Sequence, residues 1–184
     1  MSFHPREGGQ VRYLNGQKVK ERMKNLFLLR HAKAISTSEA LRDSDRSLSD
    51  QGRKQAELVG KYLKQKNIGL DLVLSSTALR ARETTELVLT AAECMSEVRY
   101  DQHMYEASRQ QLLEVVSEIE EEKKEVLLVG HNPGIEELLK RLTGRFESMG
   151  TATLAKIAFR AADWTGAVAE EGDLKWLFKA QLAG

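Results

Sequence analysis

Three short, continuously apolar runs divide the chain, at 26–29, 72–74 and 126–129. A run without polar alternation is typical of a strand that is buried on both faces of a parallel sheet. Between and after the runs, apolar residues recur at helical spacing over 49–66, 77–92, 108–122 and 133–142. Strands that alternate with helices predict an α/β fold, with three α/β/α layers and a mostly parallel central sheet.

The helix expected at 133–142 has the clearest end signals. Asn132 suits the N-cap position, and Pro133 suits the first helical turn. Two glutamates follow in the first turn, and Gly144 is a natural stop. Beyond it, 154–159 and 174–178 are expected to be two more strands, added in antiparallel fashion.

The two ends of the chain differ in character. Residues 1–24 are polar and basic without a clear period, and we expect them to form a flexible N-terminal extension. Residues 25–184 have a length that suits a single domain with its own core.

Composition excludes several classes of protein. The chain carries 28 Lys and Arg against 27 Asp and Glu, so its charge predicts neither nucleic-acid nor membrane binding. Cys94 is the single cysteine, which fits a reducing, cytoplasmic location. No cluster has metal-ligand spacing, and no heptad repeat appears. We therefore expect no metal, no cofactor and a monomer.

Candidate chemistry follows the apolar runs. Arg30 and His31 come directly after the first run, Arg80 lies in the helix after the second, and His131 follows the third. Ligands of open α/β sheets bind beyond the carboxyl ends of the strands, so these side chains are expected to meet there. Arg82 lies roughly 200° around its helix from Arg80, on the exposed side, and is expected to be structural.

Arginine and histidine at one rim have a chemical meaning. A guanidinium matches the geometry of a phosphoryl group, and a helix N-terminus after His131 adds amide donors for an anion. A neutral imidazole can attack phosphorus and carry the phosphoryl group covalently. An unperturbed histidine has a pKa near 6.5, so the rate is expected to fall below that pH.

The segments "LLRHAKA", "DSDRSLSDQGRKQA", "LSSTALRARETTE" and "LLVGHNPGIEEL" resemble, in order and spacing, the histidine phosphatase superfamily. Within it, residues 24–184 are most similar to the small SixA-like phosphohistidine phosphatase branch. The resemblance implies a phosphoglycerate mutase-like fold. It also implies that His31 is the phosphorylated nucleophile, and that Arg30, Arg80 and His131 bind the phosphoryl group.

Arg46 matches a motif arginine of the small branch, and the resemblance implies substrate binding. A surface salt bridge with Asp43 or Asp45 is an equal alternative. The chain also departs from the family, with Ala32 where many members have glycine and Ser47 where the small branch often has proline.

The general acid is not fixed by the sequence. Larger members carry a glutamate between the second arginine motif and the second histidine. Here that segment offers only Glu106, Asp101 or His103, each of which also suits a plain surface position. Phosphohistidine needs an acid less than an ester does, and the short Arg80–His131 spacing leaves no room for a capping insertion.

Three functions follow as hypotheses. The first is a phosphatase that acts on a phosphohistidine-carrying protein or a small phosphorylated metabolite. The second is a phosphoglycerate mutase-like mutase or a sugar-phosphate phosphatase. The third, of another class, is a non-catalytic phosphate-binding interaction module.

Overall fold

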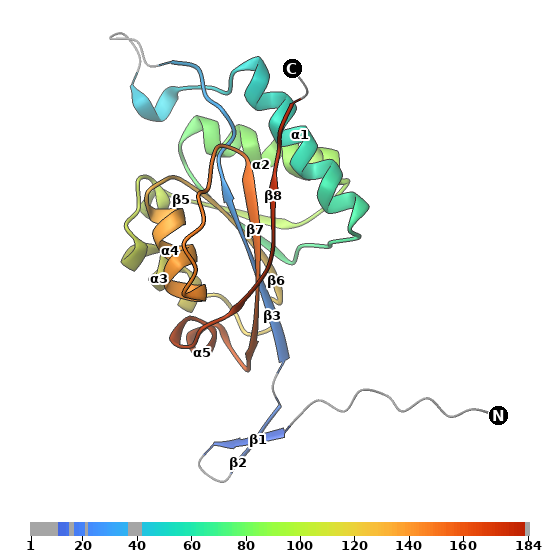
Figure 1. The fold of residues 1–184 in the computed structure, drawn as a ribbon, viewed down its shortest axis with the longest axis vertical. Helices are drawn as coiled ribbons and strands as arrows, with labels where there is room; N and C mark the ends of the chain where they lie inside the picture. The colour runs from blue at the N-terminus through green and yellow to red at the C-terminus, as the bar shows by residue number, and fades with distance from the viewer. Residues whose placement is uncertain (1–10, 15–16, 21, 37–41, 183–184) are drawn as a thin grey trace, which may run out of the picture.

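The computed structural model describes residues 11–14, 17–20, 22–36 and 42–182. Its main sheet has the strand order β5-β4-β6-β3-β7-β8 (Figure 1). The strands are β3 (Arg22–Arg30), β4 (Leu72–Ser76), β5 (Glu97–Asp101), β6 (Glu125–Gly130), β7 (Thr153–Ala161) and β8 (Asp173–Lys179). The helices are α1 (Asp50–Gln65), α2 (Leu79–Ala92), α3 (Arg109–Ser117), α4 (Gly134–Thr143) and α5 (Trp164–Ala169), with 3₁₀ turns η1 (Asp43–Asp45) and η2 (Gln102–Met104).

The sheet is mixed and mostly parallel, as predicted. β5, β4, β6 and β3 run parallel, whereas β7 pairs antiparallel with β3 and β8 antiparallel with β7. The antiparallel addition expected at 154–159 and 174–178 is therefore confirmed.

Two cores cover the two faces of this sheet. Alternate residues of β3 contribute to the two cores. Leu26 and Leu28 pack into the core under α3, α4 and α5, while Phe27 and Leu29 pack into the core under α1 and α2. All four side chains are fully buried. The helices accordingly lie in two layers on opposite sides of the sheet (Figure 1), which confirms the three-layer α/β/α prediction.

Some elements were not anticipated. β5 is an edge strand whose residues are only half-buried or exposed, so its sequence has no continuous apolar run that would predict a strand. α5 is a short helix that Asp163 caps, with its side chain accepting from the Gly166 amide. α3 ends at Ser117, well before the expected 122. The chain turns away there, and the Lys123 carbonyl accepts from Trp164 Nε1 and Lys24 Nζ.

The N-terminal segment is described only in part. β1 (Val11–Leu14) pairs with β2 (Gln17–Lys20) in a hairpin, and residues 1–10, 15–16 and 21 lie outside the described part. β3 begins at Arg22, because residues 22–24 already pair with β7. The division into a flexible extension at 1–24 and one domain at 25–184 stays a prediction.

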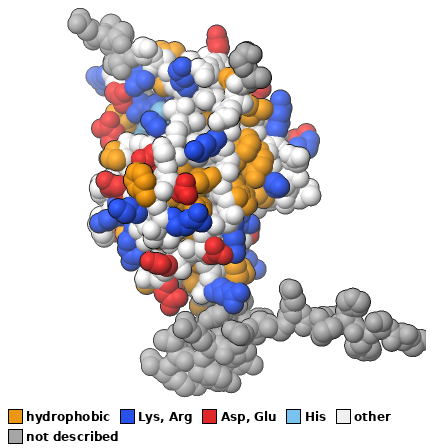
Figure 2. Space-filling view, in the orientation of Figure 1, with side chains coloured by type: hydrophobic (Ala, Val, Ile, Leu, Met, Phe, Trp, Pro, Cys, Tyr) orange, Lys and Arg blue, Asp and Glu red, His pale blue; other side chains and the backbone are white. Residues whose placement is uncertain are grey.

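Charge is mixed on the visible face of the molecule. Figure 2 shows positive and negative side chains interspersed across the face in view. Within the described ranges, no helix has both the length and the apolar composition of a membrane span.

Close packing of α1 on α2 generates a stability prediction. A Cβ added at Gly60 would lie 2.4 Å from the Val88 carbonyl oxygen, so Gly60→Ala must push the two helices apart. We expect a net loss of roughly 1–3 kcal/mol in the free energy of unfolding, measured by urea denaturation. Gly69→Ala is the matched control, because nothing lies within 4 Å of its added Cβ. Equal stability of the two variants would contradict this account of the α1–α2 contact.

Candidate active site

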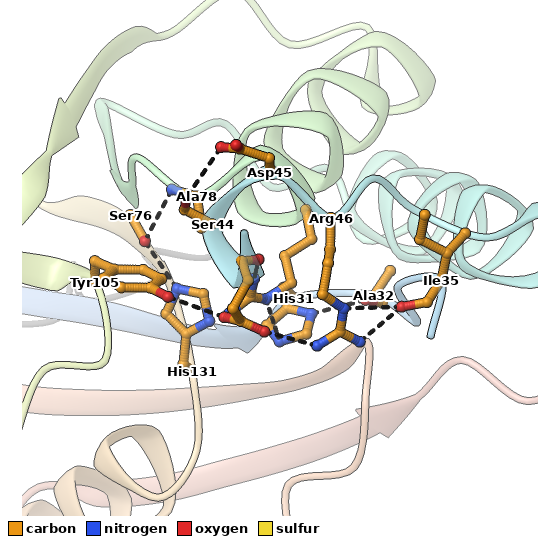
Figure 3. A network of polar contacts seen from close by, with 12 residues as sticks. His31, Ala32, Ile35, Ser44, Asp45, Arg46, Ser76, Ala78, Tyr105 and His131 are labelled. Atoms are coloured by element: carbon orange, nitrogen blue, oxygen red, sulfur yellow. Dashed lines mark hydrogen bonds and ion pairs between the residues drawn. The ribbon is translucent and has the colours of Figure 1, made fainter. Parts of the chain in front are cut away.

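Two histidines meet at the carboxyl ends of neighbouring strands. β3 and β6 pair in parallel with Arg30 opposite Gly130, so the next residue of each strand, His31 and His131, emerges at the same place. Their ring centroids lie 5.0 Å apart, although a hundred positions separate them in sequence. Figure 3 shows the two rings side by side.

His31 has a defined tautomer. Its Nδ1 lies 2.8 Å from the Ala32 carbonyl oxygen, which can only accept, so Nδ1 carries the proton. Nε2 is then a free lone pair, and it accepts from Arg80 Nε at 3.3 Å. Burial is the largest cause, and together with the nearby arginines it lowers the pKa of His31 to about 4 against the opposing effect of the Ala32 carbonyl. The pKa of His31 therefore lies well below the value near 6.5 of an unperturbed histidine.

The chain after His31 is held by α1 and α2. The Ala32 amide donates to Thr84 Oγ1 at 3.0 Å, and the Lys33 amide donates to Gln55 Oε1 at 3.1 Å. α1 approaches so closely that a Cβ at Gly52 would lie 2.0 Å from the Lys33 carbonyl oxygen. Glycine at this position lets the helix dock against the loop that carries the histidine.

His131 is 5% exposed, and its ring Nε2 is hydrogen-bonded with Ser76 Oγ, at the end of β4, at 2.8 Å. Its Nδ1 is buried and has no partner among the described residues. Burial, and then the neighbouring His31 and Arg80, lower the pKa of His131 to about 3. Like His31, it is a neutral imidazole at physiological pH.

Arg30 is held at the opposite side by the segment before β7. Its Nη1 donates to the Met149 carbonyl at 3.0 Å, and its Nε is buried without a partner in the described part of the chain. Burial lowers the pKa of Arg30 against the attraction of Glu136. Glu136 accepts from the Asn132 side chain and the Met149 amide. The Asn132 side chain is turned to Glu136 through Nδ2, and its Oδ1 accepts from no amide among the described residues. The cap prediction was therefore wrong: Pro133 is the N-cap residue of α4.

Arg80 projects from the first turn of α2 into the site, as helical geometry predicted, and is 4% exposed. Besides facing His31, its guanidinium donates to Asp43, whose backbone oxygen and Oδ2 accept from Nη1 and Nη2 at 2.6 and 2.8 Å. Arg82 is exposed and stacks over the Tyr100 ring, 5.0 Å from its centroid. The choice between the two arginines, made on position around the helix, agrees with their burial.

Arg46 makes the predicted ion pair with Asp43, at 2.8 Å, and also donates twice to the Ile35 carbonyl. Its positive charge is one of those that lower the pKa of His31. Arg46 thus forms the salt bridge and also lies close enough to His31 to affect its ionisation, and its role in substrate binding stays a prediction.

Comparison with known proteins agrees with this geometry. The model of the histidine phosphatase superfamily (branch 1) matches residues 26–109. A candidate phosphohistidine phosphatase, SixA, from Agrobacterium tumefaciens is 30% identical, with a TM-score of 0.74 over 84% of this chain and 97% of that one. The chain belongs to the histidine phosphatase superfamily.

Further relatives support the SixA-like branch of this superfamily. A candidate SixA phosphohistidine phosphatase from Nakamurella multipartita has a TM-score of 0.76 at 25% identity, over 85% of this chain and 96% of that one. An uncharacterised protein of Mycobacterium leprae is 34% identical over 119 residues, which is 63% of this chain and 71% of that protein.

In larger histidine phosphatases, the segment between the second arginine motif and the second histidine carries a glutamate. In this chain the same segment brings Tyr105 to the site. Asp101, half-buried at the end of β5, accepts from the backbone and ring of His103, while His103 and Glu106 are themselves exposed. Tyr105 instead turns inward: its ring packs edge-on against His131, with centroids 5.7 Å apart, and its hydroxyl donates to Asp43 Oδ2 at 2.9 Å. None of the three acid candidates has a contact with His31 in the described part of the chain.

Asp43, Ser76 and Tyr105 were missed as site residues. Ser76 was visible as the residue that ends the second strand, where chemistry was already expected. Asp43 and Tyr105 lie in irregular segments. Such segments have no hydrophobic periodicity, so the sequence does not predict that they approach the site. Metal ligation was not expected, and no cluster of His, Cys, Asp and Glu able to hold a metal occurs within the described ranges.

The low pKa values generate a prediction about ionisation. We expect ring NMR signals of His31 and His131 to stay those of neutral imidazoles from pH 7.5 to 5.5, whereas both titrate near 6.5 in urea-unfolded chain. Because the folded-state pKa values are lowered, protonation favours unfolding. Stability is therefore lost as the pH falls from about 6.5 towards 4. A midpoint at pH 6 or above for either ring in the folded protein would contradict this.

Proposed function

We propose that this protein is a phosphatase that works through a covalent phosphohistidine on His31 Nε2. Its family and its likeness to SixA structures support a phosphatase in general. One observation carries the finer proposal: the unprotonated Nε2 of His31 lies among three guanidiniums and a second neutral imidazole. This set combines a nucleophile with the charges that neutralise a transferring phosphoryl group.

The reaction takes two steps. In the first, the Nε2 lone pair forms a bond to phosphorus while the bond to the leaving group breaks, and the leaving group departs with the electron pair. In the second, water attacks phosphorus, the N–P bond breaks, and phosphate and neutral His31 are released. Arg30 and Arg80 stabilise the charge on the phosphoryl oxygens in both steps, and Arg46 adds to the positive field around the substrate.

His131 is assigned the role of a hydrogen-bond donor to the phosphoryl group. The Ser76 hydroxyl can donate to His131 Nε2, which leaves the proton of the neutral ring on Nδ1. Nδ1 and Arg30 Nε are both buried without partners among the described residues. Burying such donors is costly, and an oxyanion held between them would satisfy both.

The substrate we propose is phosphohistidine on a protein, with small phosphorylated metabolites as the wider class. No acidic side chain of the Asp101–Glu106 segment contacts His31 in the described structure, and an imidazole leaves without strong acid catalysis. The two structural relatives are themselves candidate phosphohistidine phosphatases. A monomer in the cytoplasm that needs no metal or cofactor stays our expectation.

The nucleophile is tested by His31→Ala. We expect phosphatase activity to fall by roughly 10³-fold or more, and an acid-labile, radiolabelled phosphoenzyme to be trapped with the wild type alone. His103→Ala is the matched control, because its side chain is 84% exposed and, among the described residues, pairs with Asp101 alone. Undiminished activity of His31→Ala would remove the proposal. A wild type that binds phosphate but forms no phosphoenzyme and has no activity would favour the non-catalytic module.

The phosphate-binding arginine is tested by two substitutions on the same helix. Arg80→Ala is expected to lower kcat/KM by about 10²-fold or more, because it removes charge stabilisation at the phosphoryl group. Arg82→Ala is expected to stay within about twofold, since that side chain is exposed. Rates on phosphohistidine and on small phosphoesters, measured side by side, decide the substrate class. A clear preference for sugar phosphates, or phosphoryl transfer between hydroxyls, would favour the mutase-like alternative.

A further inference from the structure

One carboxylate at the rim of the site joins residues from three separate segments. Asp43, in η1, accepts from Arg46 Nη1 on Oδ1, and from Arg80 Nη2 and the Tyr105 hydroxyl on Oδ2. Its backbone oxygen accepts from Arg80 Nη1 as well. Figure 3 draws this network around His31, Arg46 and Tyr105. Nothing in the two-step reaction above uses this carboxylate.

The contacts of Arg80 show what Asp43 controls. The guanidinium has five N–H donors in one rigid plane, so holding two of its nitrogens fixes where the third points. Asp43 holds Nη1 and Nη2, and Nε then faces His31 Nε2 at 3.3 Å. One further N–H on each Nη is left over for a phosphoryl group.

The Asp43 carboxylate is itself held in place by two further side chains. Tyr105 donates to the same Oδ2 that receives Arg80, and its ring lies under the Arg80 guanidinium, 5.9 Å from centroid to Cζ. Arg46 occupies Oδ1 and is itself fixed by the Ile35 carbonyl. Asp43 is thus a half-buried residue of η1 whose two carboxylate oxygens both accept from protein donors, which suits support of another group better than contact with substrate.

We propose that Asp43 is a positioning residue for phosphoryl transfer: locked by Tyr105, it orients Arg80 against the nucleophilic nitrogen of His31 and the incoming phosphoryl group. This inference rests on the proposed function. It predicts that loss of the carboxylate lowers turnover through Arg80, whose buried charge would lose its counter-ion and whose Nε would lose its fixed direction.

The test compares Asp43→Asn with Asp45→Asn. Both residues belong to η1, but the exposed Asp45 carboxylate accepts, within the described part of the chain, from the Ser44 hydroxyl alone. We expect Asp43→Asn to lower kcat roughly tenfold or more, as loss of a group that orients another commonly does. We expect it also to raise the inhibition constant of inorganic phosphate, while Asp45→Asn leaves both within about twofold. Melting temperatures of all variants establish that each is folded.

A second variant and a spectroscopic measurement keep the inference independent of folding and of turnover. Tyr105→Phe removes only the hydroxyl that locks Asp43, and we expect a smaller loss of kcat in the same direction. In the wild type, the Arg80 Nε–H signal in NMR is expected to exchange slowly with solvent, and in Asp43→Asn to exchange rapidly.

The outcomes separate the inference from the function on which it rests. If the wild type turns over and Asp43→Asn matches Asp45→Asn, the positioning role is wrong while the phosphatase stands. Tighter binding of phosphate by Asp43→Asn would also overturn it, since Asp43 would then be a competitor for Arg80. If the wild type has no activity, the proposed function fails, and the Arg80 signal still shows whether Asp43 orients it.

Discussion

The parallel register between β3 and β6 is the constraint on which the site depends. Because Arg30 lies opposite Gly130, both strands end level, and the residues that follow them are brought within contact. Fully buried leucine, phenylalanine and valine side chains on both faces hold this register. A shift of one residue would turn each of those side chains to the other core. The apolar run before Arg30 and His31 therefore determines where these two side chains lie.

Burial then sets the ionisation of the site. The same packing that positions the imidazoles removes them from water, and desolvation is the largest cause of the low pKa of both. Guanidiniums stay charged under these conditions, whereas imidazoles lose their proton. Cationic arginines around neutral histidines are the combination that phosphoryl transfer to nitrogen requires, and one environment produces both.

Arg80 and Arg30 are each oriented with the help of an acidic residue from another segment of the chain. Asp43 holds Arg80 directly, and Glu136 holds the Met149 peptide to which Arg30 donates. Both carboxylates are engaged by protein donors, so they orient the cations without filling the phosphoryl site. Tyr105 extends the same arrangement on the side of His131. The site is thus a set of charges whose directions are fixed before a substrate arrives.

The sequence by itself determined the alternation of buried strands and helices, the strand ends that carry Arg30, His31 and His131, and the burial of Arg80 rather than Arg82. Those features follow from local periodicity, which short-range geometry controls. Only the tertiary structure decided the pKa of His31, the inward turn of Tyr105, the edge strand β5 and the role of Asn132 beside Glu136 rather than at a helix cap. Each depends on contacts between segments tens of residues apart, or on an exposed or irregular backbone, and no local pattern records such contacts.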